Sequence, residues 1–209
     1  MKTYLFDLDG TLLDSMELIL TSFHHTTQVH LGQDLPDSQW LAGVGTPLRT
    51  QLAKIARSEE ELDAMMDTYR TFNLDQHDAM ARAFPGVVEV VQELHRRGAK
   101  LALVTSKLSD GTDRGVRLLG LENELSVRVC ADDVQRGKPH PEPVLKALAA
   151  LDASPEGALF IGDSAHDIEA GRQADVDTVA VGWGPIPRSE LEAAKPTHWI
   201  ETAEELLAL

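Results

Sequence analysis

Short apolar runs alternate with amphipathic stretches along most of this chain. The runs are rich in Val, Leu and Ile and are bounded by turn residues, a pattern typical of strands buried on both faces of a sheet. They are YLF (4–6), KLALVTS (100–106), LSVRVCA (125–131), ALFIGDS (158–164) and TVAVGWG (178–184). A short strand at THWI (197–200) and a helix at ETAEELLAL (201–209) follow them.

The stretches between these runs have the period of helices that pack on a sheet. The first, GVVEVVQELHRRG (86–98), stops at Gly98 and has four apolar residues on one face, Val87, Val90, Val91 and Leu94. The second, PEPVLKALAALD (141–152), begins with prolines and places together Val144, Leu145, Leu148 and Leu151. Strands that alternate with helices in this way predict an α/β fold with a doubly wound, mainly parallel sheet.

Residues 15–83 break this alternation, because they contain no convincing strand but at least three helical patterns. Two apolar stripes have helical spacing, and we interpret both as the core of a helix bundle: Met16, Ile19, Leu20 and Phe23, and then Leu62, Met65, Met66 and Tyr69. Ser58 and Glu61 form a candidate capping box before the second stripe. We therefore predict a helical cap domain at 15–83, inserted into an α/β core domain formed by 1–14 and 84–209.

The composition narrows the class of protein. The 209 residues carry a formal net charge of −15, which argues against nucleic acid or an anionic membrane surface as a partner. No apolar run is long enough to span a membrane, and Asp7 and Asp9 interrupt any signal-peptide pattern, so we expect a cytoplasmic protein. The one cysteine, Cys130, ends an apolar run and is expected to be a buried structural thiol.

Polar side chains gather where the predicted strands end. Because the carboxyl ends of parallel strands meet at one edge of a sheet, four separate loops deliver these groups to the same place. The groups are Asp7 and Asp9, then Thr105, Ser106 and Lys107, then Lys138, and finally Asp163, Ser164 and Asp167. Two neighbouring carboxylates repel unless a divalent cation lies between them. Mg²⁺ prefers such hard oxygen ligands and supplies the positive charge that the chain lacks.

Each group also has a simpler interpretation. Ser164 and Asp167 would cap a helix, Lys138 would be a solvated loop lysine, and Thr105 would bond to the backbone at a strand end. A calcium loop is excluded at DLDG because Leu12 and Leu18 stand where it needs glycine and glutamate. A serine nucleophile elbow is excluded at Ser164 by His166. The simple interpretations explain each residue alone but not their meeting at successive strand ends.

Four motifs occur together in order: DLDGT (7–11), LVTSK (103–107), GKPHPEP (137–143) and GDSAHD (162–167). In this set the chain resembles the haloacid dehalogenase-like hydrolases, which are mostly phosphatases. The resemblance covers essentially the whole chain, including the helical insertion, which looks like the cap of such enzymes. Asp9 favours phosphate chemistry, because the dehalogenases of the superfamily lack this second aspartate.

The resemblance implies a role for each motif residue. Asp7 would be the nucleophile that forms an aspartyl-phosphate, and Asp9 the general acid and then base. Asp7, Asp163 and the main-chain carbonyl of Asp9 would hold Mg²⁺, supported by Asp167. Three further groups would bind the transferring phosphoryl oxygens: Thr105, the Ser106 amide and Lys138.

These motifs say less about the substrate than about the reaction. The chain looks similar to the phosphoglycolate phosphatase-like branch and, through YRTFNLDQHD (69–78) and DDVQRGKPHPEPVLKAL (132–148), to inorganic pyrophosphatases of this superfamily. A small phosphorylated metabolite or pyrophosphate is therefore the expected substrate, for a monomer or a homodimer. Cations at the cap would complement the non-transferring group. The candidates are Arg49, which GVGTPL is expected to turn toward the site, and also Arg70, His24 or His25, His77 and Lys107.

Two other functions remain open from the sequence. A sugar-phosphate phosphomutase shares DLDGT and a helical cap, and Arg49 would then seat a second phosphate. A receiver-like signalling module also carries an aspartate cluster, a hydroxyl and a lysine at the ends of a parallel sheet. The helical insertion and the length of 209 residues argue against the second of these.

Overall fold

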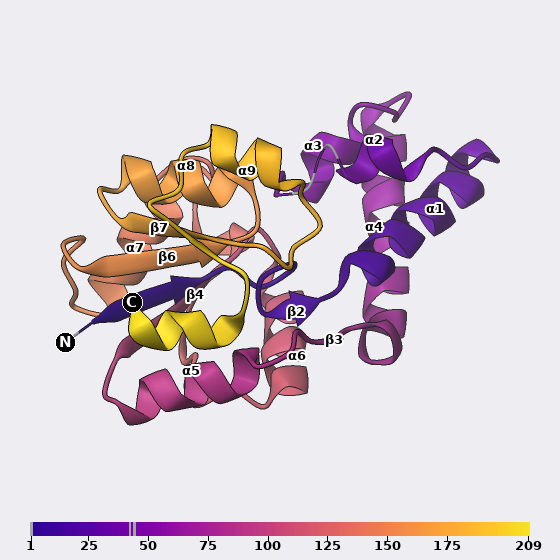
Figure 1. The fold of residues 1–209 in the computed structure, drawn as a ribbon. Coiled ribbons are helices and arrows are strands. Elements are labelled where there is room, and N and C mark those ends of the chain that lie inside the picture. Colours follow the sequence, from indigo (N-terminus) through magenta and orange to yellow (C-terminus); the bar gives the residue numbers. More distant parts are fainter. Residues whose placement is uncertain (1, 42, 44) are drawn as a thin grey trace.

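The computed structural model describes residues 2–41, 43 and 45–209 (Figure 1). Its main sheet has six parallel strands, and β1 (Thr3–Phe6) lies in the middle between β4 (Lys100–Val104) and β6 (Ala158–Gly162). The outer strands are β5 (Val127–Val129) beside β4, and β7 (Asp177–Val181) and then β8 (His198–Ile200) beside β6. The predicted doubly wound parallel sheet is confirmed.

Helices cover both faces of this sheet (Figure 1). Because successive strand residues point to opposite faces, Tyr4 and Phe6 join one apolar cluster and Leu5 joins the other. The first cluster contains α5 (Val87–Arg96), α6 (Ser109–Leu119) and the 3₁₀ helix η2 (Ala203–Ala208). The second contains α7 (Glu142–Ala150) and α8 (Ala165–Gln173). A short 3₁₀ helix, η1 (Ala131–Asp133), follows β5, and α9 (Arg188–Ala193) precedes β8.

The apolar face predicted for 86–98 is buried as expected, and Gly98 follows the helix with a positive φ. The face predicted for 141–152 is wrong at Leu145, which is 45% exposed, while Val144 and Leu148 are buried. Neighbouring helix residues point about 100° apart, so the sheet that covers Val144 cannot also cover Leu145. Cys130 is buried, and this burial raises the pKa of its thiol.

The helical insertion lies to one side of the sheet, at its carboxyl edge (Figure 1). It consists of α1 (Met16–Leu31), α2 (Asp37–Leu41), α3 (Leu48–Leu52) and α4 (Glu59–Met80). The expectation that 15–83 holds no strand is wrong at its end, because β3 (Arg82–Ala83) pairs antiparallel with β2 (Leu13–Asp14). Strands of two residues are too short to show a sequence period. They form here because the chain leaves and re-enters the sheet-containing part at one place.

The insertion has its own apolar cluster, in which Phe23 stacks on Trp40 with ring centroids 4.2 Å apart. At the start of α4, the Ser58 hydroxyl accepts a hydrogen bond from the Glu61 amide at 3.2 Å. The Glu61 carboxylate binds Arg57 instead of returning to Ser58, so only half of the predicted capping box forms.

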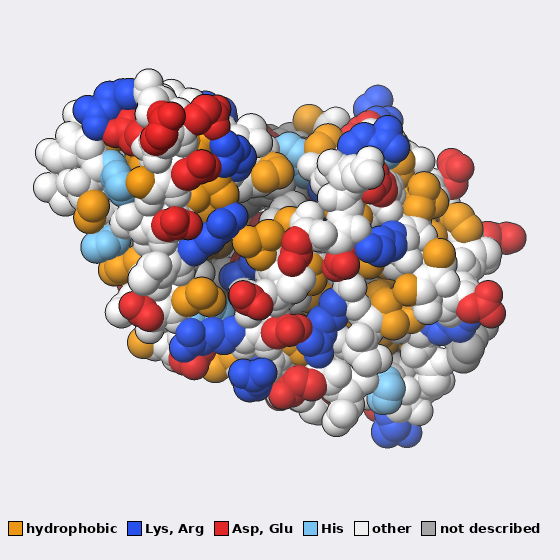
Figure 2. Space-filling view, turned by 180° about the vertical axis from the view of Figure 1, so that it is seen from behind, with side chains coloured by type: hydrophobic (Ala, Val, Ile, Leu, Met, Phe, Trp, Pro, Cys, Tyr) orange, Lys and Arg blue, Asp and Glu red, His pale blue; other side chains and the backbone are white. Residues whose placement is uncertain are grey.

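The back of the molecule is hollowed between the insertion and the sheet-containing part (Figure 2). Acidic and basic side chains are interspersed on this face, without one large patch of either sign. Across the described part of the chain, every helix falls short of the length and apolar character that crossing a bilayer requires.

Candidate active site

The central position of β1 places its carboxyl end in the middle of the sheet edge. Asp7 follows β1 directly, and its amide still donates to the Ile161 carbonyl of β6 at 2.9 Å. The chain then turns at Gly10, whose φ of +83° is in the left-handed region that favours glycine. A Cβ atom at this position would lie 2.2 Å from Asp163 Oδ2. The glycine of DLDGT therefore lets the loop after β1 lie against the loop after β6.

Three buried carboxylates meet where these loops touch. Oxygen atoms of Asp7, Asp163 and Asp167 all lie within 4.8 Å of one another. Asp163 is 1% exposed, and its Oδ1 accepts a hydrogen bond from the Thr11 hydroxyl at 3.0 Å. Its Oδ2 is buried without a hydrogen-bond partner among the described residues.

Lys138 reaches this cluster from the loop after β5, which confirms that it is not a solvated loop lysine. Its ammonium lies 2.9 Å from Asp7 Oδ1 and 2.6 Å from Asp167 Oδ1, and it donates to the Val104 carbonyl at 3.2 Å. The Lys138 side chain is 1% exposed. Burial lowers its pKa, but the two carboxylates outweigh this and the net shift is upward, so the ammonium stays charged.

The electrostatics of the cluster fit a divalent cation. Burial raises the pKa of Asp7 to about 7, against the opposing effect of Lys138. Burial and the neighbouring carboxylates of Asp167 and Asp7 raise the pKa of Asp163 well above its usual value. When all three carboxylates are ionised, they and the one ammonium leave two negative charges uncompensated. A divalent ion beside Asp163 Oδ2 would balance them and give that oxygen a partner.

Asp167 caps α8, as its simpler interpretation predicted, and also contacts Lys138. Its Oδ2 accepts from the Ser164 amide at 3.0 Å and from the Ser164 hydroxyl at 2.6 Å, which closes a capping box at the start of α8. Its Oδ1 holds Lys138. Since both Asp167 oxygens already have partners, this residue supports the cluster and leaves Asp7 and Asp163 as the available carboxylate ligands.

Asp9 lies apart from the three buried carboxylates and faces Lys107. The Lys107 ammonium lies 3.0 and 3.1 Å from the two Asp9 oxygens, and the Ser15 hydroxyl donates to Oδ1 at 2.6 Å. Burial raises the pKa of Asp9, but Lys107 and Ser15 outweigh this, and the net pKa is lower than usual. Asp9 is therefore ionised in this arrangement.

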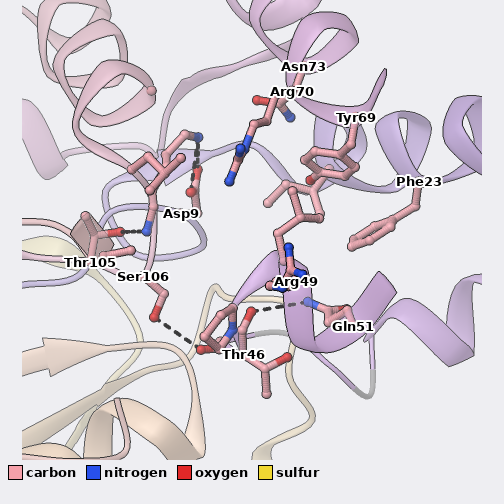
Figure 3. Close-up of a pocket in the computed structure, with 18 of the residues that line it drawn as sticks. Asp9, Phe23, Thr46, Arg49, Gln51, Tyr69, Arg70, Asn73, Thr105 and Ser106 are labelled. Carbon is pink, nitrogen blue, oxygen red and sulfur yellow. Dashed lines mark hydrogen bonds and ion pairs between the residues drawn. The ribbon is translucent and has the colours of Figure 1, made fainter. Parts of the chain in front are cut away.

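The loop after β4 adds two hydroxyls to the same edge. The Thr105 hydroxyl accepts from the Lys107 amide at 3.2 Å, which leaves its own hydrogen to donate. The Ser106 hydroxyl donates to the Gly45 carbonyl of the insertion at 3.2 Å (Figure 3). Gly45, within the segment GVGTPL that was expected to turn the chain toward the site, thus lies at this edge of the sheet.

A cavity of about 310 Å³ lies between this edge and the insertion. Asp7, Asp9, Thr105, Ser106, Lys107 and Asp163 line it from the sheet side. From the helical side it is mostly apolar, lined among others by Met16, Ile19, Leu20, Met66 and Tyr69. The first stripe predicted to be bundle core, and Met66 and Tyr69 of the second, therefore also form one wall of the cavity.

Of the cap cations predicted from the sequence, the two arginines lie at this cavity (Figure 3). Arg49 and Arg70 both line it. The histidines do not belong to its described lining: His24 pairs with Asp37 at 2.7 Å, His25 stacks on Phe72, and His77 is buried against Asp78.

Sequence reasoning missed the hydroxyls that hold the carboxylates in place. Thr11 binds Asp163, and Ser15 binds Asp9. Trp183 also reaches the DLDGT loop, since its indole nitrogen donates to the Thr11 carbonyl at 3.0 Å. Thr11 stands inside a recognised motif and was findable there. The contacts of Ser15 and Trp183 depend on tertiary structure, and no local pattern indicates them.

Comparison with known proteins finds similar sequences and similar structures. The model of the family "Haloacid dehalogenase-like hydrolase" matches residues 4–181. Pyrophosphatase PpaX from Anoxybacillus flavithermus is 39% identical over 208 residues, which are 100% of this chain and 96% of that protein. A solved haloacid dehalogenase-like hydrolase from Bacteroides fragilis superposes with a TM-score of 0.90 at 25% identity, covering 98% of this chain and 99% of that one. A Lactobacillus plantarum protein assigned as a phosphoglycolate phosphatase has a TM-score of 0.88 at 25% identity, with 100% and 99% covered.

Proposed function

Since the chain belongs to the haloacid dehalogenase-like hydrolase family and is a phosphohydrolase of that family, we propose that it hydrolyses inorganic pyrophosphate with Mg²⁺. Phosphoglycolate-type monoesters are the second substrate class to test. The observation that carries the proposal is the buried cluster of Asp7, Asp163 and Lys138 at the floor of a cavity that the insertion covers.

Asp7, Asp163 and the main-chain carbonyl of Asp9 would hold the metal, with Asp167 fixing Lys138 beside them. Bound there, Mg²⁺ supplies Lewis-acid stabilisation of the charge on the phosphoryl oxygens. The unpartnered Oδ2 of Asp163 supports this assignment.

In the first step, an Asp7 carboxylate oxygen attacks the near phosphorus atom. The bond from that phosphorus to the bridging oxygen breaks, and the second phosphate leaves with the electron pair. Asp9 lies on the cavity side of the loop, where it can protonate the leaving oxygen. Its ion pair with Lys107 keeps it ionised, so it has to take up a proton first.

In the second step, a water molecule attacks the phosphorus of the aspartyl-phosphate. Asp9 accepts the proton of this water, phosphate is released, and the Asp7 carboxylate is restored. During both steps Thr105, the Ser106 amide and Lys138 would bind the phosphoryl oxygens and stabilise their growing charge.

We also propose that 15–83 acts as the cap domain of the core formed by 1–14 and 84–209. The small cavity between them suits a small phosphate compound. The pyrophosphatase relative, similar over the whole chain, supports pyrophosphate as its occupant. The cytoplasmic location and the monomeric or homodimeric state stay predictions from the sequence.

A phosphomutase is less well supported. It needs a seat for a second sugar phosphate, which Arg49 was expected to provide. Arg49 instead pairs with Glu59 and Asp63 of the insertion. A receiver-like switch is also disfavoured, because the helices α1–α4 interrupt the sheet directly after its central strand.

The test is release of phosphate from a panel of pyrophosphate, 2-phosphoglycolate, hexose phosphates and an aryl phosphate, each with Mg²⁺ and with a chelator. We expect hydrolysis of pyrophosphate only with Mg²⁺. Asp7→Asn should reduce kcat by about 10⁴-fold or more. Asp177→Asn, an exposed aspartate, is the matched control and should leave kcat unchanged. An Asp7→Asn protein as active as the parent would refute the proposed chemistry.

A further inference from the structure

The cationic side chains near the cavity differ in their carboxylate partners. Lys138 is held by Asp7 and Asp167. Lys107 is held by both oxygens of Asp9. Both ammonium groups therefore already have carboxylate partners at the phosphoryl-transfer site, so neither is the cation for the far end of a substrate.

Arg49, the cap residue favoured from the sequence, is also neutralised. Its guanidinium contacts Asp63 at 2.6 Å and also Glu59, and it touches the Met66 sulfur. These carboxylates belong to the first turns of α4. Arg49 therefore ties α3 to the start of α4, although it reaches the cavity wall.

Arg70 is the exception among these cations. It makes no hydrogen bond or ion pair with any residue that the structure describes, and it is partly buried on α4. Figure 3 shows its side chain extending from α4 into the cavity on the side of Asp9. The helical wall to which it belongs is largely apolar, with Ile19, Leu20 and Leu74 among its lining residues, and Asn73 lies beside Arg70 (Figure 3).

An arginine that extends into a cavity without a counter-ion keeps its charge and its N–H donors available for an anion. The position of Arg70 on the insertion, across the cavity from the phosphoryl-transfer site, is where the far end of a bound substrate would lie. The guanidinium fork matches the oxygens of a phosphate or carboxylate in a bidentate manner. It also opposes the overall charge of −15, which otherwise repels anions.

We propose that Arg70 binds the second anionic group of the substrate, which in pyrophosphate is the leaving phosphate. This inference rests on the proposed function and deepens it, because it commits the enzyme to small phosphate compounds that carry a second negative group. Arg49 then has a structural role in the cap.

The experiment compares Arg70→Ala with the parent on substrates with and without a second anionic group. For pyrophosphate we expect KM to rise by about tenfold to hundredfold, the usual effect of losing a charge-assisted bidentate contact. For an aryl phosphate, whose leaving group carries no second anionic group, kcat/KM should change by less than about threefold. Arg70→Lys should lie between, since it keeps the charge but loses the fork.

Arg57→Ala is the matched control, because Arg57 lies on the same insertion but binds Glu61 outside the cavity. Arg57→Ala should leave KM and kcat/KM unchanged for both substrates. Binding without turnover is measured by calorimetry with imidodiphosphate, a hydrolysis-resistant analogue, and Arg70→Ala should weaken it by the same factor as KM.

The outcomes separate the two proposals. If the parent hydrolyses 2-phosphoglycolate and not pyrophosphate, pyrophosphate is the wrong substrate, and Arg70→Ala must then raise KM for phosphoglycolate instead. If the parent hydrolyses pyrophosphate and Arg70→Ala has the same KM, the inference is wrong while the proposed function stands. An equal loss on pyrophosphate and aryl phosphate overturns it as well, because that result means a general effect on the fold. A parent that acts only on aryl phosphates overturns both.

Discussion

The two walls of the cavity differ in the kind of side chains that form them. On the sheet side, Asp7, Asp163 and Lys138 are buried in one cluster, and they come from the loops that follow β1, β6 and β5. On the helical side, the wall is mostly apolar, and its arginines differ in pairing, with Arg49 held by exposed carboxylates and Arg70 by none that the structure describes.

We interpret this difference as a division of roles, with phosphoryl transfer on the sheet side and substrate selection on the helical side. A phosphoryl-transfer site needs fixed charges whose positions do not depend on the substrate, and strand ends in the middle of a sheet provide them. Substrate choice needs only complementarity to the non-reacting end, and helices joined through a two-stranded connection can supply it. We therefore expect substitutions on the sheet side to have large energetic effects, and substitutions on the helical side to have smaller ones.

The largest effect is expected at Lys138. Lys138→Ala leaves the buried carboxylates of Asp7 and Asp167 without their ammonium, and breaking a buried pair in this way costs about 3–5 kcal/mol. Chemical denaturation of the metal-free protein measures this loss. Lys146→Ala, a half-exposed lysine paired with Asp133, is the control and should change stability by less than about 0.5 kcal/mol. Equal effects of the two variants would mean that the cluster is no more sensitive than the surface.

Gly10→Ala is expected to have the next largest effect. Gly10 and Gly98 have nearly the same φ, +83° and +82°, so alanine at either destabilises the backbone by about 1–2 kcal/mol. Only at Gly10 would the new Cβ meet Asp163 Oδ2, at 2.2 Å, whereas at Gly98 nothing lies within 4 Å. Gly10→Ala should therefore also weaken Mg²⁺ binding by about tenfold or more, and Gly98→Ala should not. Mg²⁺ titrations of both variants by calorimetry decide this.

Binding of Mg²⁺ should depend on pH. Below about pH 7 the metal-free protein holds a proton on Asp7, whose pKa burial raises to about 7, and the raised pKa of Asp163 acts in the same direction. The metal has to displace these protons, so its affinity falls as pH falls. We expect about tenfold or more weaker binding at about pH 6 than at about pH 8.

Trp183 fluorescence is expected to report this binding, because its indole contacts the Thr11 carbonyl in the loop that would hold the metal. Affinity that stays constant over this pH range would contradict the proton displacement. It would mean that the carboxylates are already ionised without the metal.

The smallest effect is expected where the helical side meets the sheet side. Arg114 of α6 binds both Asp78 oxygens, at 2.9 and 3.1 Å, and the Leu74 carbonyl of α4. Because Asp78 is exposed and Arg114 is partly exposed, Arg114→Ala should lower stability by less than about 1 kcal/mol. The contact still positions α4, so KM for pyrophosphate should rise a few-fold, and less at high salt. Unchanged kinetics at low salt would show that this contact does not hold the cap.

The sheet side was largely predictable from the sequence, and the reasons are physical. Buried parallel strands appear as continuous apolar runs, and groups that follow them must meet at one edge, which placed Asp7, Lys138 and Asp163 in one site. The helical side was less predictable. Helical spacing identified the stripes of α1 and α4 but not that they also line a cavity.

The cap cations show the same limit. The sequence does not distinguish Arg49 from Arg70. Only the packing of α3 against α4 shows that Arg49 forms ion pairs with Glu59 and Asp63. The short pairing of β2 with β3 was missed for a related reason, because two residues carry no period. The exposure of Leu145 also depends on which part of α7 the sheet covers.

The most direct test of the account is to trap the phosphoryl group. Protein turning over pyrophosphate with Mg²⁺ is quenched rapidly in acid, digested and examined by mass spectrometry. The account predicts one added phosphoryl group on the peptide that contains Asp7, absent when a chelator replaces Mg²⁺ and absent in Asp7→Asn. Full turnover with that peptide unmodified at every quench time, and the same turnover in Asp7→Asn, would contradict it.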